Sequence, residues 1–399
     1  MRQFFNKRFE NAGAGDRIVA MEGMRGFAAL LVFFVHFNAL FRPYLCPSSW
    51  AATPAAVGGS FGHAGVDLFF VLSGFLIYGI IIGKHPSYST FLRRRVRRLY
   101  PVFVVVLGVC VALSLVFPAQ SRLPRSISQA VVYIGANLLM LPGMTRIPPI
   151  ITVAWSLSYE WFFYLTVPLL VAVLDLRRWS NRQRIVFFLL LPLAYTALWL
   201  LGLTGNIRLI LFAAGIVLWE LVDQDVPRHL PSWLEYVVAV AFLANLLAVG
   251  MAGVKLGPTS LILSSVPHYY APSLFITLLP FCLYAMFFGG FLNRVFSWDY
   301  LRWLGNISYS YYLIHGLVLH GVRLMVNRLF LLVPRSAFFD VVLFATCMLL
   351  TILSAAVLYL LVEKPLSWSN AERNVRLIIP PMRETLGPLE SGEGTVSKA

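Results

Sequence analysis

Apolar stretches long enough to cross a lipid bilayer follow one another through almost all of the 399 residues. A hydrocarbon core of about 30 Å requires roughly 20 apolar residues in a helix. Ten stretches meet this requirement: residues 18–41, 61–82, 99–118, 151–174, 185–202, 206–222, 234–252, 271–290, 303–322 and 338–362. The sequence therefore predicts an all-α fold, a polytopic membrane bundle of about ten transmembrane helices. A further stretch at 126–141 is shorter and more polar, and it either lies along the interface or re-enters the membrane.

The composition agrees with a chain that is surrounded by lipid. Only 12% of the residues are charged, whereas a soluble domain carries about 25% because its surface meets water. The run at 18–41 is longer than the roughly 7–15 apolar residues of a signal peptide, so we expect it to remain as a transmembrane helix. The four cysteines lie apart and show no metal-ligand spacing, so no metal site is expected.

The net charge of +15 has two interpretations: a nucleic-acid-binding surface, or the excess of Lys and Arg that cytoplasmic loops carry. With the N-terminus inside, the predicted cytoplasmic segments hold 22 Lys and Arg residues and the outer segments hold 8. This bias predicts that both termini are cytoplasmic, and it accounts for the charge without nucleic acid.

Three regions are expected along the chain. Residues 1–17 form a cytoplasmic N-terminal segment, 18–366 the membrane domain and 367–399 a cytoplasmic tail. The tail is polar and rich in Gly and Glu, and after about residue 380 it is expected to be largely disordered.

The first predicted helix carries ionisable side chains, which are costly in lipid and therefore indicate function. Arg25 and His36 lie eleven positions apart, which is about 20° more than three whole turns, so they share one face. Their separation along the axis is roughly 16 Å, with Arg25 near the cytoplasmic end. The alternative is that Arg25 reaches the headgroups and that His36 caps a neighbouring helix.

Further polar residues fall on the second and fourth predicted helices. Asp67 lies four residues after His63 on the same face and needs a partner in lipid, for instance Arg25 or a histidine. A purely structural Asp–His pair is the alternative. Ser73 and Gly74 permit close packing of helices. The fourth helix places Ser156 and Glu160 four residues apart, with Tyr164 a further turn along.

Two more features lie on the cytoplasmic side and on the ninth predicted helix. Five guanidinium groups follow the second helix in the cytoplasmic segment 84–98, at Arg93, Arg94, Arg95, Arg97 and Arg98. They suit phosphate, which the planar fork binds bidentately, or anionic lipid. Ser308, Tyr312 and His315 form one polar stripe, which is typical of a cavity wall. Glu363 and Lys364 before Pro365 indicate a helix stop with an interfacial ion pair.

Several stretches together resemble the membrane-bound acyltransferase-3 family, the bacterial O-acyltransferases that decorate polysaccharides and other exported glycans. They follow the family's order between residues 21 and 366. The matching stretches are MEGMRGFAALLVFFVHF, GVDLFFVLSGFLI, LRRRVRRLYP, VAWSLSYEWFFYLTVPLL, LGNISYSYYLIH and YLLVEKPL.

The resemblance implies an enzyme of a bacterial inner membrane. It would move an acyl group, expected to be acetyl, from cytosolic acyl-CoA to a hydroxyl of an extracytoplasmic glycan or glycolipid, with no permanently bound cofactor. The family's arginine, ten residues, histidine signature falls on Arg25 and His36. Its paired-arginine element falls between Arg93 and Arg98. The family usually has Asp where this chain has Glu22, which leaves the role of that carboxylate open.

These expectations give the polar residues candidate roles. His36 is the general base, because its unperturbed pKa lies near the operating pH, and Asp67 or Glu160 holds its tautomer. The expected donor-binding residues are Arg25, Arg93, Arg94, Arg97 and Arg98. The expected substrate pocket comprises Ser73, Ser156, Tyr164, Ser308, Tyr312 and His315. A covalent acyl intermediate on His36 or on a serine remains open.

Two other classes of function are compatible with polar residues in several helices. A transporter or flippase would use them as a substrate pathway, although the sequence has no inverted repeat and no matched pair of broken helices. A sensor or scaffold would tolerate substitution of Arg25 and His36. Labelled acyl transfer in purified membranes separates the enzyme from both.

Overall fold

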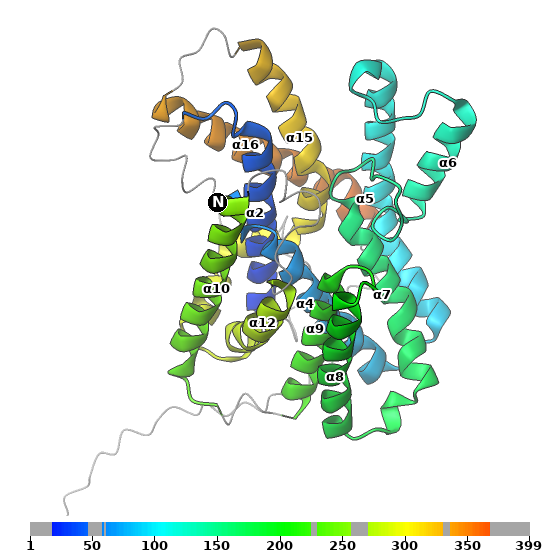
Figure 1. The fold of residues 1–399 in the computed structure, drawn as a ribbon, viewed down its shortest axis with the longest axis vertical. Coiled ribbons are helices and arrows are strands. Elements are labelled where there is room, and N and C mark those ends of the chain that lie inside the picture. The colour runs from blue at the N-terminus through cyan, green and yellow to red at the C-terminus, as the bar shows by residue number, and fades with distance from the viewer. Residues whose placement is uncertain are drawn as a thin grey trace, which may run out of the picture.

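The computed structural model describes residues 18–46, 58–59, 61–224, 230–256, 270–329 and 336–367. Every regular element in these ranges is helical, and the helices pack into one bundle (Figure 1). The predicted all-α membrane bundle is therefore confirmed. The expectations for residues 1–17 and for the tail after 367 lie outside the described residues, and the cytoplasmic placement of both termini stays a prediction.

The helices have the following bounds. The first half of the chain contains α2 (Val19–Phe41), α4 (Ala64–Lys84), α5 (Tyr88–Val116), α6 (Ile127–Leu138), α7 (Ala154–Val173), α8 (Asn181–Leu200) and α9 (Ile210–Asp223). The second half contains α10 (Leu234–Leu256), α12 (Tyr270–Phe287), α13 (Phe291–Phe296), α14 (Asp299–Asn306), α15 (Ser308–Leu329), α16 (Ala337–Leu358), a π-helical turn (Tyr359–Glu363) and α17 (Lys364–Ser367). Short 3-10 turns occur at Pro118–Gln120, Leu176–Arg178 and Ile207–Leu209.

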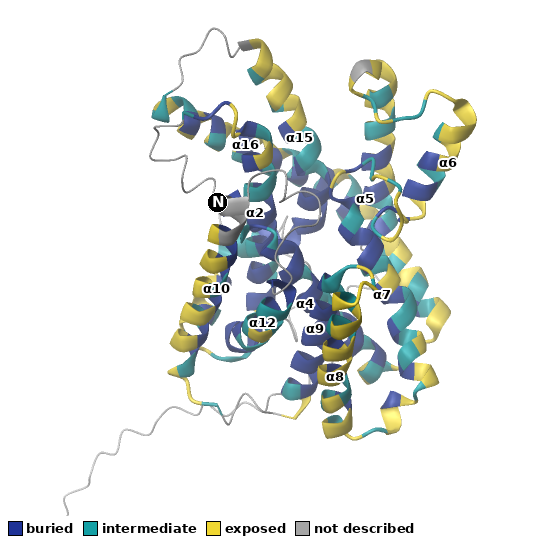
Figure 2. Cartoon of the chain, in the orientation of Figure 1, coloured by how far each residue is buried: buried dark blue, intermediate teal, exposed yellow. Residues whose placement is uncertain are grey.

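Within the described residues, eight helices are long and apolar enough to cross a membrane. They correspond to eight of the ten predicted segments. The other two segments are also helical: 206–222 contains α9, which has only 14 residues, and 303–322 contains most of α15, whose Ser, Tyr and His residues make it more polar. Nearly every residue of α9 is buried, so this short helix lies inside the bundle (Figure 2).

Small residues let α4 and α9 approach closely at the centre of the bundle. A methyl group added at Gly74 would lie 2.1 Å from the carbonyl oxygen of Phe212, and one at Gly215 would lie 2.0 Å from that of Val71. The two backbones are therefore in contact, as small residues allow in membrane helices. The expectation that Ser73–Gly74 permits close packing is confirmed.

The arginine run differs from its predicted placement. It was expected in a cytoplasmic segment before the third transmembrane helix, but α5 begins at Tyr88, after the N-cap Ser87, whose side chain accepts a hydrogen bond from Thr90 N at 3.4 Å. The run therefore occupies the second and third turns of the helix. Helical periodicity then decides which guanidinium groups point into the bundle and which point away.

The segment 126–141 contains the short helix α6, at the edge of the molecule (Figure 1). Its apolar residues Ile127, Val131 and Val132 are all exposed, so the helix offers an apolar face to its surroundings. Whether it lies in the interface or re-enters the membrane stays a prediction.

A buried ion pair joins α8 to α9, and a hydrogen bond from α4 reaches the same carboxylate. The Arg184 guanidinium donates to both carboxylate oxygens of Glu220, at 2.7 and 3.0 Å. The hydroxyl of Tyr78 on α4 donates to the same carboxylate at 2.5 Å. Glu220 is completely buried, and an unpaired carboxylate there would be strongly destabilising.

We predict that Glu220→Gln lowers the melting temperature of the purified protein in lipid nanodiscs, because Arg184 is left buried without a counter-ion. Breaking a buried pair costs about 3–5 kcal/mol. Asp175→Asn is the matched control, because the pair of Asp175 with Arg178 is exposed at both residues and is worth about 0–1 kcal/mol. Equal melting temperatures for the two variants would contradict the structural role of the buried pair.

Candidate functional site

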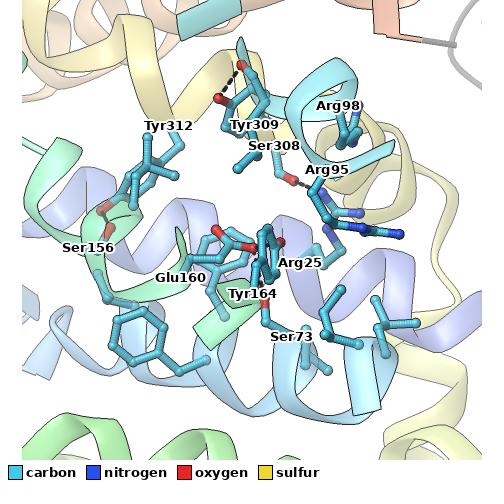
Figure 3. Close-up of a pocket in the computed structure, with 18 residues that line it drawn as sticks. Arg25, Ser73, Arg95, Arg98, Ser156, Glu160, Tyr164, Ser308, Tyr309 and Tyr312 are labelled. Carbon is cyan, nitrogen blue, oxygen red and sulfur yellow. Dashed lines mark hydrogen bonds between the residues drawn. The ribbon is translucent and has the colours of Figure 1, made fainter. Parts of the chain in front are cut away.

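A cavity with an empty volume of about 860 Å³, counting its open mouth, lies between α2, α4, α5, α7 and α15 (Figure 3). Its walls combine three arginines, one carboxylate, several hydroxyls and apolar side chains. The lining residues are Arg25, Val66, Phe69, Phe70, Leu72, Ser73, Leu76, Ile77, Arg95, Arg98, Leu99, Ser156, Leu157, Glu160, Tyr164, Ser308, Tyr309 and Tyr312. No described group of His, Cys, Asp and Glu could hold a metal ion.

Helical spacing explains why these residues meet. On α4, the lining positions recur every three or four residues from Val66 to Ile77, so one stripe of that helix faces the cavity over about 16 Å. On α7, Ser156, Glu160 and Tyr164 repeat at four residues and form a second stripe. The sequence predicted this second stripe, and the structure brings it opposite Arg25.

Arginine side chains gather at one end of the cavity (Figure 3). Arg25 on α2 donates to the hydroxyl of Ser308 at 3.1 Å. The Arg95 guanidinium lies over the rings of Phe91 and Tyr164, 5.4 and 5.8 Å from their centroids. Neither Arg25 nor Arg95 has a carboxylate within ion-pair distance among the described residues. Both cations are therefore available to an anionic ligand.

The arginine run divides between the cavity and the surface. Arg98 lines the cavity and forms a 2.5 Å ion pair with Glu363. Arg95, which the sequence interpretation left out of the donor-binding set, also lines the cavity. Arg93, Arg94 and Arg97 are exposed and do not line it. Spacing alone could not have selected Arg95 and Arg98, because Arg94 and Arg97 are also three residues apart.

Glu160 lies between the two ends of the cavity (Figure 3). Ser73 donates to one of its carboxylate oxygens at 3.1 Å, and Tyr164 donates to the same oxygen. The structure therefore gives this carboxylate hydroxyl partners in place of the expected histidine. It contributes negative charge to the cavity, close to Arg25.

The opposite end of the cavity is closed by a hydrogen-bonded tyrosine. The hydroxyl of Tyr312 lies 2.7 Å from Ser156 Oγ and 3.1 Å from the carbonyl oxygen of Val153. If Tyr312 donates to the carbonyl, Ser156 donates to Tyr312. The ring also contacts Phe69, with centroids 6.0 Å apart. Tyr312 is therefore fixed at both its hydroxyl and its ring.

His36 and His315 form a pair behind this tyrosine. Their ring centroids are 5.0 Å apart, and His315 lies 6.1 Å from Tyr312. Neither histidine belongs to the cavity lining. His315 Nδ1 lies 3.0 Å from the carbonyl oxygen of Tyr311, so Nδ1 carries the proton and donates it. Its buried Nε2 has no hydrogen-bond partner in the part of the chain that the structure describes.

The structure places Asp67 away from both histidines of this pair. Its carboxylate lies 3.8 Å from the Arg208 guanidinium, which in turn lies over the rings of Trp155 and Tyr270 at 5.6 and 5.5 Å. Asp67 is completely buried and does not line the cavity. The expected partner, Arg25 or a histidine, is therefore replaced by Arg208, which was not considered a candidate.

Two carboxylates outside the cavity also acquire partners across the fold. Glu22 lies 3.2 Å from a guanidinium nitrogen of Arg302 on α14. Glu363 is completely buried and accepts hydrogen bonds from Arg98 and from both the backbone and the side chain of Ser310. The expected interfacial ion pair at the end of the last helix is therefore a buried pair with Arg98, 265 residues away.

The chain was compared with known proteins. The model of one family, described as an acyltransferase domain, matches residues 18–360. The peptidoglycan O-acetyltransferase OatA of Listeria monocytogenes is 24% identical over 331 residues, 75% of this chain and 49% of the relative. The acyltransferase MdmB of Streptomyces mycarofaciens is 28% identical over 340 residues, 78% of this chain and 82% of the relative.

The O-acetyltransferase OatA of Staphylococcus aureus is 28% identical over 191 residues, 44% of this chain and 28% of the relative. The chain thus spans about half the length of the Listeria relative and less of the Staphylococcus one. No solved structure matches the chain.

We predict that Asp67→Asn and Arg208→Gln are each destabilising, and that the double variant loses less stability than the two single losses added together. Each single change leaves a buried charge alone, whereas the double change removes both. Coupling between contacting residues is about 0.5–3 kcal/mol. Thermal unfolding of the four proteins in nanodiscs measures it. When Asp67→Asn is combined with His36→Ala instead, the two losses of stability should add. Coupling between Asp67 and His36 would contradict the observed pairing of Asp67 with Arg208.

Proposed function

The chain belongs to the acyltransferase family whose model matches residues 18–360, and on that premise we propose that it is an integral-membrane O-acyltransferase. It transfers an acyl group, acetyl in the first instance, from acyl-CoA to a hydroxyl of an extracytoplasmic glycan or glycolipid. Two relatives are named O-acetyltransferases, which supports the acetyl group. We place the protein in a bacterial inner membrane, with both termini in the cytoplasm.

The observation that carries the proposal is the cavity with two cations that lack carboxylate partners. Coenzyme A is polyanionic, and guanidinium groups bind phosphate oxygens bidentately. Arg25 and Arg95 lie at one end of the cavity with no carboxylate within ion-pair distance among the described residues. Apolar side chains and hydroxyls line the rest, where the thioester would extend. The proposed donor enters from the arginine end, which the charge bias assigns to the cytoplasm.

In the proposed reaction His36 is the general base. It takes the proton from the acceptor hydroxyl as that oxygen attacks the thioester carbonyl carbon. The carbon–sulfur bond then breaks, the acyl group stays on the oxygen, and the leaving thiolate takes up the proton and departs as CoA thiol. The contact of His36 with His315, and of His315 with Tyr312 in the cavity wall, supports this role.

We predict that His36→Ala abolishes acyl transfer while the protein remains folded. Membranes containing the protein are incubated with acetyl-CoA labelled in the acetyl group, and alkali-labile label in the glycan and lipid fractions measures ester formation. Loss of a general base lowers the rate by about 10²–10⁴-fold. His320→Ala, on the exposed part of α15, is the matched control and should retain activity.

Two outcomes of this assay would overturn the proposal at different points. Normal ester formation by the His36→Ala variant would show that His36 is not the general base, while the protein would still be an acyltransferase. The other outcome is that the wild-type protein forms no labelled ester and moves a labelled glycolipid across the membrane of proteoliposomes. That result would show that the protein is a flippase and not an acyltransferase.

We predict that Arg95→Gln raises the apparent KM for acetyl-CoA about tenfold or more, because a hydrogen bond to a charged group is worth about 1.5–3 kcal/mol. Arg97→Gln is the matched control: it lies two residues along the same helix, carries the same charge, and is exposed outside the cavity. Initial rates are measured against donor concentration. Equal KM values for both variants would show that the run acts through anionic lipid and not through the donor.

A further inference from the structure

The cavity has two chemically different ends, and this polarity orients an extended ligand. Arg25, Arg95 and Arg98 lie at one end, and Tyr312 with Ser156 lies at the other (Figure 3). A ligand with an anionic head and an apolar tail would place the head on the arginines. Its tail would then point toward Tyr312 and the neighbouring Phe69, because a buried apolar group is stabilised only among apolar neighbours.

The wall at the Tyr312 end cannot easily move. The Tyr312 hydroxyl is held by Ser156 and by the carbonyl of Val153, and its ring meets Phe69 edge to face. The next residue, Phe70, also lines the cavity. The Phe70 ring is stacked on Phe212, with centroids 4.5 Å apart, and Phe212 is stacked on Phe163, with centroids 4.2 Å apart. These stacked rings continue from the cavity wall into the core of the bundle.

Such a wall limits how far an apolar tail can extend. Protein interiors are packed as densely as organic crystals, and forcing extra methylenes into a filled site requires off-rotamer side chains and backbone shifts. The Tyr312 side chain is anchored by hydrogen bonds, so displacing it would leave buried polar groups unpaired.

We propose that Phe69 is a specificity-determining residue that, together with Tyr312, sets the maximum length of the acyl chain transferred. The proposal rests on the proposed function, because it takes the cavity as the site of the acyl-CoA donor. Acetyl ends short of the wall formed by Phe69 and Tyr312. A chain several carbons longer collides with it.

Helix α4 itself provides a matched pair of positions for a test. Phe69 and Leu76 both line the cavity and lie seven residues apart, which places them on one face of the helix about 10.5 Å apart. Phe69 borders the closed end, whereas Leu76 lies two turns closer to the end of α4 that precedes the arginine-bearing helix. Shortening either side chain enlarges the same cavity, but only the change at Phe69 enlarges it beyond the acyl group.

The experiment measures binding of two thioethers, S-ethyl-CoA and S-hexyl-CoA, which cannot transfer their alkyl group and need no acceptor. Calorimetry is performed on the purified full-length protein in lipid nanodiscs, with empty nanodiscs as the blank for partition into lipid. The proteins compared are wild type, Phe69→Ala, the milder Phe69→Leu in case the alanine variant does not fold, and Leu76→Ala.

We expect the wild-type protein to bind S-ethyl-CoA more tightly than S-hexyl-CoA. Each methylene that becomes buried strengthens binding about fourfold, so Phe69→Ala should shift the ratio of the two Kd values at least about tenfold toward the hexyl thioether. Phe69→Leu should shift it in the same direction by less. Leu76→Ala should leave the ratio unchanged.

The possible failures are distinguishable. If the wild-type protein binds neither thioether, the cavity is not a CoA site and the proposed function loses its donor. If it binds both equally, or if Leu76→Ala shifts the ratio as much as Phe69→Ala, CoA binding stands but Phe69 does not set the chain length.

Discussion

A guanidinium group removed from water is stabilised by a counter-charge, and four such ion pairs join the helices of this bundle. Three of the four pairs join segments at least 141 positions apart in sequence, and a charge pair at close range offsets the cost of removing both groups from water. The pairs are Arg98–Glu363, Arg184–Glu220, Arg208–Asp67 and Arg302–Glu22, at 2.5 to 3.8 Å. Each pair ties together segments that the apolar surfaces alone would allow to slide.

Arg25 and Arg95 depart from that pattern, and both face the cavity. Among the described residues Arg25 donates to the Ser308 hydroxyl and to no carboxylate, and Arg95 lies over aromatic rings. The nearby Glu160 carboxylate is occupied by hydroxyl donors from Ser73 and Tyr164. The cavity therefore keeps positive charge that its own carboxylate does not cancel. A polyanionic ligand would supply the missing counter-charge, which is the physical basis of the proposed donor site.

The sequence predicted the helices and eight of the ten polar residues of the cavity wall, because polar side chains in apolar helices stand out and recur at helical spacing. Ser156 and Glu160 recur at one helical turn, and a stripe of that kind turned out to line the cavity. Local periodicity does not predict which residue pairs with a buried charge. Asp67 pairs with Arg208, a contact between residues 141 positions apart that no periodicity encodes. Arg95 was missed for a local reason, because the arginine run was placed in a loop and its inward face was not considered.

The position of the histidine pair constrains how the proposed reaction can run. His36 and Arg25 both lie on α2, yet only Arg25 lines the cavity, and His315 contacts both His36 and the cavity residue Tyr312. The thioester carbonyl must therefore reach the Tyr312 end of the cavity before His36 can act on an incoming hydroxyl. A general base must lie within hydrogen-bond reach of the attacking hydroxyl, so the proposed acceptor would have to meet the thioester at the edge of the Tyr312 ring, where its hydroxyl can also reach His36.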